Sequence, residues 1–167
     1  MIAAALFYST LASALGCGLI AGVFFAFSSF VMPALARLPP AQGIAAMQSI
    51  NVVVLNRWFL AVFVGTGGAC AILAVASLVG WSEPGSKMRI LASASYLLGT
   101  IVVTGARNIP LNDALMQVSP TAASAPEWWL RYVSDWTKWN TVRTLAALGA
   151  ATLFTLALVY SEHEETR

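Results

Sequence analysis

Four stretches of the chain carry no charged side chain over lengths that approach or exceed a bilayer crossing. They are residues 1–36, 58–82, 90–106 and 144–161. A membrane-spanning helix needs about 20 predominantly apolar residues. The hydropathy pattern therefore predicts an all-α membrane protein with four transmembrane helices, in a single integral membrane domain over residues 1–167.

Prolines and polar clusters predict where these helices stop. Proline cannot continue a helix interior, so the first helix is expected to end near Met32 and Pro33. The third helix is expected to end near Arg107 and Asn108, because the residue before Pro110 is biased toward extended geometry. The polar segment 81–88 reads as a tight turn between the second and third helices.

The two longer connections carry helical patterns of their own. One short helix is predicted over residues 41–50, running directly into the second long helix. Another is predicted over 110–117, followed by a linker at 119–126 and an amphipathic stretch from 127 that continues into the fourth helix. The fold class is thus a four-transmembrane-helix bundle with two loop-side excursions carrying short amphipathic helices.

Four crossings place both termini and the turn at 81–88 on one side, and the two longer connections on the other. The positive charges are unequal between these sides. On the side of the connections they are Arg37, Arg57, Arg107, Arg131, Lys138 and Arg143, against Lys87, Arg89 and Arg167 on the opposite side. The positive-inside rule would turn the connections to the cytoplasm. Without Arg57, Arg107 and Arg143, if a site retains them, the count is equal, so the orientation stays open.

Composition narrows the class of protein. Apolar residues make up 59% of the chain and charged residues 10%, against about 25% charged residues in soluble domains. The net charge of +2 includes no long run of one sign, so a nucleic-acid partner is not expected. The first apolar stretch lacks a preceding basic residue and is too long for a signal peptide. We expect a multi-pass protein, in the cytoplasmic membrane if the chain is bacterial.

Cysteine and histidine usage excludes some chemistry. Cys17 and Cys70 lie inside the first two apolar stretches without a Cys-x-x-Cys motif, so both are expected to be buried small hydrophobes. His163 is the only histidine, which excludes a bis-histidine haem or a multi-histidine metal site within one chain.

Small residues recur within the first two helices. Gly18 and Gly22 form a Gly-x-x-x-Gly pair, and Gly65 and Gly68 lie in the second helix. Small residues let helix backbones approach closely in lipid. These glycines are therefore predicted to pack the helices of the bundle.

Polar side chains gather where the long helices meet the connections. An asparagine or arginine held in hydrocarbon costs several kcal/mol unless it is paired or faces a wet cavity, so such residues are candidates for a site. Two interpretations stand side by side: a shared pocket, or anchoring in which Arg57 and Arg143 reach lipid phosphates and Asn108 caps a helix. The residues are Asn51, Asn56, Arg57, Arg107, Asn108, Asn112, Asn140 and Arg143.

Aromatic residues join this cluster along the fourth helix. Six side chains fall within an arc of about 100° at roughly 100° per residue. They are Trp129, Tyr132, Trp136, Trp139, Asn140 and Arg143. The alternative is an interfacial aromatic belt, which fits Trp128 and Trp129 best. Among the nearby acids, Asp113 is the candidate general base by position; alternatively, it is a solvated carboxylate in the first turn of a helix.

Four motifs in order along the chain resemble the anthrone oxygenase family of small four-helix membrane proteins. The first is the glycine- and phenylalanine-rich stretch 18–28 followed by Val31-Met32-Pro33-Ala34-Leu35, and the second is Met47-Gln48-x-Ile50-Asn51 with Asn56. The third is Asn108-Ile109-Pro110-Leu111-Asn112, and the fourth is Trp136-x-x-Trp139-Asn140-x-x-Arg143. The last two together are the most specific part of the resemblance.

The resemblance implies an oxygenase that converts an anthrone, a tricyclic phenolic ketone, into an anthraquinone with dioxygen and without a cofactor. Such a reaction needs a base, donors for the enolate oxygen and a flat apolar slot. The implied catalytic residues are Arg143, Arg107 and Asp113. The implied substrate-binding residues are Asn51, Asn56, Asn108, Asn112, Tyr132, Trp136, Trp139 and Asn140.

Two other functions stay open at this point. One is a small lipophile-binding or transport protein without enzymatic activity, although the centres of the helices offer few polar residues for an aqueous path. The other is a structural subunit that docks a partner through its loops. The expected partners are a lipophilic aromatic small molecule and the lipid bilayer, with a homo-oligomer left open.

Overall fold

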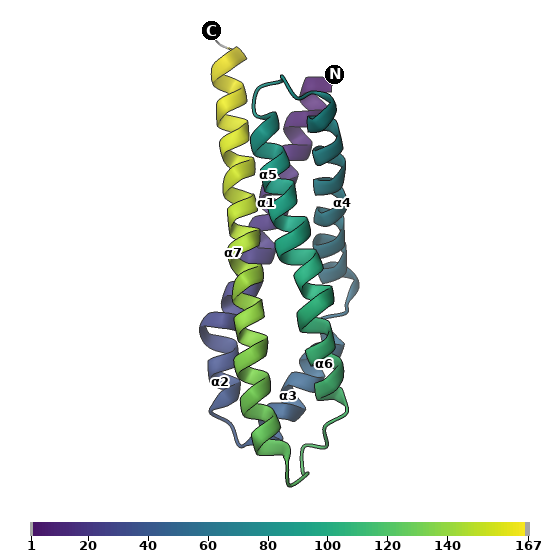
Figure 1. Ribbon diagram of the computed structural model, residues 1–167, viewed down its shortest axis with the longest axis vertical. Helices are drawn as coiled ribbons and strands as arrows, with labels where there is room; N and C mark the ends of the chain where they lie inside the picture. The colour runs from purple at the N-terminus through teal and green to yellow at the C-terminus, as the bar shows by residue number, and fades with distance from the viewer. Residues whose placement is uncertain (1, 166–167) are drawn as a thin grey trace.

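The backbone of the computed structural model is described for residues 2–165 and its side chains for residues 4–161. The described chain is all-helical, and its elements follow one another along four long rods (Figure 1). They are α1 (Ile2–Ala26), η1 (Phe27–Val31), α2 (Met32–Ala36), α3 (Pro40–Val53), α4 (Arg57–Val79), α5 (Ser86–Tyr96), η2 (Leu97–Val102), η3 (Thr104–Asn108), α6 (Ile109–Met116) and α7 (Ala125–Glu165). The side chain of His163 lies outside the described residues.

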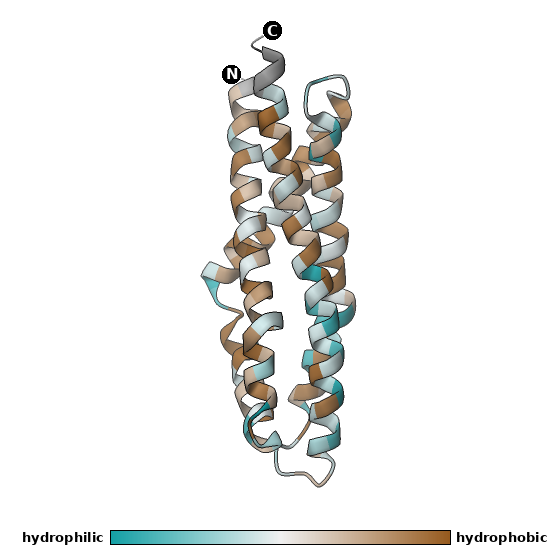
Figure 2. Cartoon of the chain, turned by 90° about the vertical axis from the view of Figure 1, so that its left-hand side faces the viewer, coloured by the Kyte–Doolittle hydropathy of each residue, from teal (hydrophilic) through white to brown (hydrophobic). Residues whose placement is uncertain are grey.

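Four helical segments are long and apolar enough to cross a membrane: Ala4–Ala36, Arg57–Val79, Ser86–Met116 and Ala125–Ser161. The protein is therefore an integral multi-pass membrane protein with a four-helix bundle, which confirms the predicted fold class. Both termini lie at one end of the bundle with the turn between α4 and α5 (Figure 1). We call the opposite end, which carries α2, α3, α6 and the start of α7, the loop end; hydrophilic positions are concentrated toward it (Figure 2).

Pro33 and Pro110 do not end their helices, so the predicted ends near Met32 and Asn108 are wrong. The π-helical segments η1 and η3 lie directly before α2 and α6, in whose first turns the two prolines sit. A proline ring clashes with the carbonyl four residues earlier in a regular α-helix, and it lacks the N–H that would bond there. A π-turn shifts the bonding to the fifth residue and opens the backbone at that place. The first and third rods therefore extend into the loop end as α2 and α6.

The predicted direct continuation from the short helix into the second long helix is also wrong. α3 ends at Val53, and α4 begins only at Arg57. Asn56 separates the two by capping α4, because its Oδ1 accepts hydrogen bonds from the backbone N–H groups of Trp58 (3.1 Å) and Phe59 (3.0 Å). Such a cap satisfies donors that the first turn of a helix leaves unpaired. α3 can therefore lie across the loop end while α4 follows the bundle.

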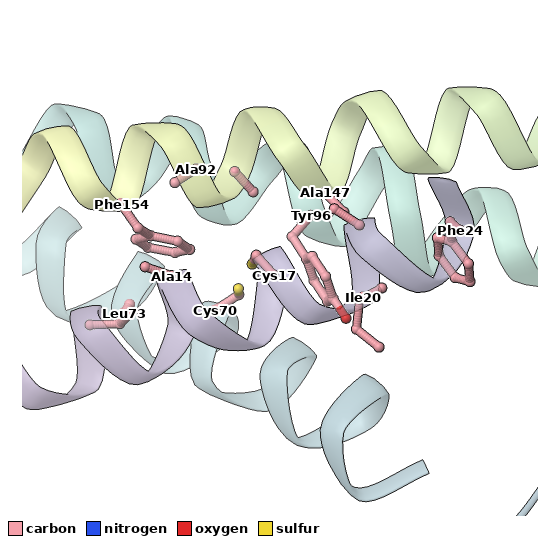
Figure 3. Close-up of a cluster of buried hydrophobic side chains, with 12 residues drawn as sticks. Ala14, Cys17, Ile20, Phe24, Cys70, Leu73, Ala92, Tyr96, Ala147 and Phe154 are labelled. Atoms are coloured by element: carbon pink, nitrogen blue, oxygen red, sulfur yellow. The ribbon is translucent and has the colours of Figure 1, made fainter. Parts of the chain in front are cut away.

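The core in the middle of the bundle is built from small and aromatic side chains (Figure 3). Cys17 and Cys70 are fully buried there, as predicted, and their sulfur atoms lie side by side. Tyr96 lies beside them and donates a hydrogen bond to the backbone carbonyl of Phe63 at 3.1 Å. This core holds α1, α4, α5 and α7 together on the terminal side of the cavity described below.

Glycines assist helix packing at positions other than those predicted. A Cβ atom added at Gly16 would lie 2.2 Å from Thr66 Oγ1, and one at Gly99 would lie 2.4 Å from Ala146 Cβ. For the predicted set, Gly18, Gly22, Gly65 and Gly68, an added Cβ would meet no described atom within 4 Å. That prediction is wrong, because the rotation of α1 and α4 turns these glycines away from the neighbouring helices of the chain.

Candidate functional site

A cavity of about 160 Å³ lies within the loop end, where α1, α3, α4, α6 and α7 meet. We call it the loop-side cavity. Most of its lining is apolar, and its polar side chains come from only four residues besides the Trp136 indole: Asn51, Thr104, Asn112 and Arg143. Its apolar lining consists of Val23, Phe24, Phe27, Met47, Ile50, Val54, Leu55, Phe59, Leu60, Phe63 and Ile109.

Arg143 is the only charged side chain among the cavity-lining residues, and only 5% of it is exposed. Its Nη1 donates to Thr104 Oγ1 at 3.1 Å and its Nη2 to Asn140 Oδ1 at 2.7 Å, whereas its Nε has no partner within the described chain. The guanidinium carbon lies 4.1 Å from the centre of the Phe24 ring and 5.4 Å from that of Trp136. The guanidinium is thus held by uncharged hydrogen-bonding groups and by the faces of two aromatic rings.

The charge of Arg143 has no acidic counter-ion in the described part of the chain. The one ion pair there joins Arg131 and Glu127, one turn apart on the exposed face of α7. A buried cation without a carboxylate partner is costly, and an anionic ligand lowers that cost. The region around Arg143 is therefore electrostatically suited to an oxyanion.

Asn140 fixes the position of Arg143 from one turn earlier on α7. Its amide nitrogen donates to the Phe24 carbonyl at 2.6 Å and to Ser28 Oγ at 2.7 Å, and its amide oxygen accepts from Arg143. The side chain is fully buried and is not among the cavity-lining residues. The predicted residue Asn140 thus lies behind the guanidinium and links it to the junction of α1 and η1.

Asn112 forms a second polar group on the wall of the cavity. Its Oδ1 accepts from the Tyr132 hydroxyl at 2.9 Å and from Trp136 Nε1 at 2.8 Å. The rings of Trp129, Tyr132 and Trp136 follow one another along α7 with centroid separations of 5.7 and 6.5 Å. The predicted aromatic arc therefore packs inside the loop end, and its Trp129, Tyr132 and Trp136 are buried.

Asn51 brings α3 to the same cavity. Its side chain lies close to the Tyr132 hydroxyl, but its Nδ2 makes no hydrogen bond of normal geometry with a described atom. Buried amide nitrogens are nearly always paired, and an unpaired one leaves a desolvation penalty. Asn51 Nδ2 and Arg143 Nε are thus both buried donors without a hydrogen-bond partner among the described residues, and both residues line the cavity.

The remaining predicted site residues lie outside the cavity lining. Asn108 is buried and donates from Nδ2 to the Trp136 carbonyl at 3.3 Å, which ties η3 to α7. The Arg107 guanidinium carbon lies 4.7 Å from the centre of the Trp139 ring, and Arg107 itself is exposed. Asp113 is exposed, and Asn56 is the cap of α4. The roles proposed for these four residues and Trp139 remain predictions.

Several cavity residues cannot be told from their neighbours by the hydropathy pattern. Phe24 and Phe27 belong to a long apolar run, and the stacked pair Phe59 and Phe63 has centroids 5.7 Å apart in another. Thr104 is one of many hydroxyl residues in the helices. The one signal in the sequence is its spacing from Asn108: residues four positions apart share one helix face, so Thr104 lies on the same face as that site candidate.

One side of the cavity opens on the outer surface of the bundle. Three of its lining residues have substantially exposed side chains: Leu55 (67%), Leu60 (37%) and Ile109 (47%). All three are apolar, and they belong to the end of the α3–α4 connection, to α4 and to α6. We call these three residues the mouth of the loop-side cavity. The opening of the cavity on the side of the bundle is therefore lined by apolar side chains.

The described side chains contain no cluster of three or more His, Cys, Asp or Glu residues that could hold a metal ion. Polar groups available to a bound molecule in the cavity are instead amides, a hydroxyl and a guanidinium. These groups can stabilise negative charge on oxygen.

The fold and the cavity define a multi-pass helical membrane protein with an aromatic-walled cavity, containing a buried guanidinium, at one end of a four-helix bundle. Residues 55–153 match the model of the family described as anthrone oxygenase. This match covers more than half of the chain, so the chain belongs to the anthrone oxygenase family, which confirms the resemblance of the motifs. No curated protein and no solved structure shows a significant match to the chain.

Proposed function

We propose that this protein is a membrane-bound oxygenase that uses dioxygen to oxidise a lipophilic aromatic ketone of the anthrone type in the loop-side cavity. The observation that carries the proposal is Arg143, a buried cation without a described acidic counter-ion at the wall of an apolar aromatic cavity. Membership of the anthrone oxygenase family supports the type of reaction.

Arg143 would act on the first step, in which the ring methylene opposite the ketone loses a proton. The resulting enolate carries its charge mainly on oxygen, where a guanidinium and amide N–H groups can stabilise it. Desolvation by the surrounding rings strengthens this interaction relative to water. The aromatic residues Phe24 and Trp136, which lie against Arg143, supply faces for the rings of the substrate.

The overall oxidation is balanced by dioxygen alone. The enolate passes an electron to dioxygen, and the resulting radical and superoxide combine into a peroxide at the former methylene carbon. The peroxide takes up one proton from solvent, and loss of the second proton from that carbon then breaks the O–O bond and gives the new carbonyl and hydroxide. Two protons lost from carbon balance the two taken up by the oxygen that leaves as water.

The size and position of the cavity fit partial enclosure of such a substrate. A cavity of about 150 Å³ holds a benzene-sized molecule, and the loop-side cavity has about 160 Å³. A tricyclic molecule would place its oxygen-bearing edge inside and extend past Leu55, Leu60 and Ile109 toward lipid. The apolar mouth supports delivery of the substrate through the membrane.

The lining residues include no carboxylate and no histidine. Asp113, the base expected from its position in the sequence, is exposed and lies outside the lining. We therefore assign the first proton to water or hydroxide that enters the loop-side cavity, with Arg143 making the methylene more acidic by stabilising its conjugate base.

The test is oxygen uptake by the purified protein in phosphatidylcholine nanodiscs supplied with anthrone, with protein-free nanodiscs as the blank for spontaneous oxidation. ¹⁸O₂ should label the new carbonyl of the anthraquinone. Arg143→Met should lower the rate about 10²–10³-fold, the usual loss for a donor that stabilises an oxyanion. Arg131→Gln, on the exposed face of α7, serves as the matched arginine control. Equal rates for Arg143→Met and the unchanged protein would overturn the proposal.

A second candidate function is a lipophile-binding protein without turnover, favoured by the lack of a base among the lining residues. It predicts retention of anthrone or anthraquinone by the nanodiscs under nitrogen and no oxygen uptake above the blank in air. The two candidates thus differ in one measurement.

A further inference from the structure

The hydrogen bonds of Asn112 determine which end of its amide is engaged within the chain and which end is free. Trp136 Nε1 can only donate, and it lies 2.8 Å from one terminal atom of the Asn112 side chain, which must therefore be the oxygen. The Tyr132 hydroxyl donates to the same oxygen at 2.9 Å. Asn112 Nδ2 is left without a hydrogen bond to any described atom, on a residue that lines the cavity.

The other polar side chains of the wall also offer few free acceptors. The Thr104 hydroxyl donates to the Thr100 carbonyl at 2.7 Å and accepts from Arg143, so both of its functions are in use. Arg143 has donors only. Asn51 Nδ2 and Arg143 Nε are buried donors of lining residues without a partner among the described residues. The polar wall is thus dominated by donors.

From this arrangement we infer that Asn112 is a specificity-determining residue, and that the cavity selects flat apolar molecules carrying an acceptor oxygen, a carbonyl or an oxyanion, at the inserted edge. Tyr132 is a positioning residue, because it lies outside the cavity lining and acts on the ligand only through the amide of Asn112. Trp136 holds the same amide, and its ring also lines the cavity. Arg143 and Asn112 together receive the acceptor oxygen. The inference rests on the proposed function for the location of the site, but it concerns binding and holds whether or not the bound molecule reacts.

Two molecules with the same ring system separate this recognition from general lipophilicity. Anthraquinone has two carbonyl acceptors and no O–H donor, and anthracene has the same three rings without oxygen. Both partition into lipid, so retention by protein-containing phosphatidylcholine nanodiscs is measured over that of empty nanodiscs under nitrogen. The unchanged protein should retain anthraquinone about ten-fold more tightly than anthracene, since two donors are left unpaired by the hydrocarbon.

Asn112→Asp keeps the shape of the side chain and an acceptor for Tyr132 and Trp136, but replaces the free amide donor by a second acceptor oxygen. This variant should lose most of the preference for anthraquinone while its affinity for anthracene changes little. Asn112→Leu removes the amide but keeps the volume of the side chain. It should likewise lose most of the preference for anthraquinone, and it replaces the aspartate variant should that variant fail to fold. Gln42→Glu makes the same chemical change on the exposed face of α3, outside the lining, and should leave the preference intact.

Tyr132→Phe tests the positioning role. It removes one of the two donors that hold the Asn112 oxygen, so the preference for anthraquinone should fall about three-fold while anthracene binding is unchanged, because the amide is then held by a single neutral hydrogen bond.

An unchanged anthraquinone-to-anthracene ratio in both Asn112 variants would overturn the inference, as would equal retention of the two molecules by the unchanged protein. Selective binding without oxygen uptake from anthrone would instead overturn the proposed oxygenase and leave the inference standing. Oxygen uptake that depends on Arg143, together with an anthraquinone-to-anthracene ratio that does not depend on Asn112, would support the proposed oxygenase and overturn the inference.

Discussion

Asn140 and Arg143 lie one turn apart on α7 and are joined by a hydrogen bond of 2.7 Å from the guanidinium to the amide oxygen. The amide nitrogen of Asn140 is anchored on α1 and η1 through the Phe24 carbonyl and Ser28. The guanidinium therefore keeps its place over Phe24 because a neutral side chain connects it to a different helix. The contact between α7 and the first rod, which consists of α1, η1 and α2, therefore fixes the position of the Arg143 charge.

Replacing Asn140 by alanine should release Arg143 and leave the Phe24 carbonyl without its side-chain partner. Loss of a buried partner costs about 1–3 kcal/mol, so the melting temperature in detergent should fall. Oxygen uptake from anthrone should fall at least about ten-fold, because a misplaced group of this kind loses its transition-state contact. Thr152→Val, an exposed residue of α7 whose hydroxyl bonds only within its helix, is the control. Full activity in Asn140→Ala would show that Arg143 needs no such support.

Hydropathy predicted the four crossings because a membrane span depends on composition over many residues rather than on any one contact. The same reasoning could not separate Arg107 from Arg143. Each follows a long apolar run or precedes one, yet Arg107 is exposed and Arg143 is buried. Their difference arises from the rotation of the third and fourth rods about their axes, which is set by packing against neighbouring helices.

The two prolines show a second limit of reading the sequence. Pro33 and Pro110 predicted helix ends because that reasoning assumes α-helical hydrogen bonds on both sides. That assumption does not hold for the π-helical segments that precede them. No single residue in η1 or η3 predicts a π-helical turn. As a result, the sequence does not predict that Asn112 lies on a continuous third rod.

Gly85 should be far less replaceable than Gly105. Gly85 has φ +75°, and a Cβ atom there would lie 2.8 Å from Ser161 Oγ and 2.9 Å from the Ala157 carbonyl oxygen. Gly85→Ala should lower the free energy of unfolding by at least about 1–2 kcal/mol, the cost of left-handed backbone for an L residue. At Gly105, within η3, an added Cβ meets no described atom within 4 Å. Gly105→Ala should therefore be neutral or stabilising in the same thermal unfolding measurement.

Cys17 and Cys70 should resist thiol reagents in the folded protein. Both side chains are fully buried in the core between α1, α4 and Tyr96. Burial keeps a thiol out of reach of reagents. Intact mass after treatment with a membrane-permeant maleimide should show no addition in nanodiscs and two additions after unfolding in sodium dodecyl sulfate. Rapid labelling of the folded protein would show that the core opens on the time scale of the reaction.

Leu60 offers a test of access from lipid, because it lies at the mouth and is 37% exposed. Leu60→Trp should narrow the opening next to Leu55 and Ile109 without introducing a charge or removing a hydrogen bond. We expect oxygen uptake at low anthrone content of the nanodisc to fall about ten-fold, while the melting temperature changes little, since surface substitutions shift stability by about 0.5 kcal/mol at most. Leu78→Trp makes the same change at an exposed position of α4 far from the cavity and should be without effect. Unaltered uptake in Leu60→Trp, with the control also unaltered, would mean that the substrate reaches Arg143 by a path other than this mouth.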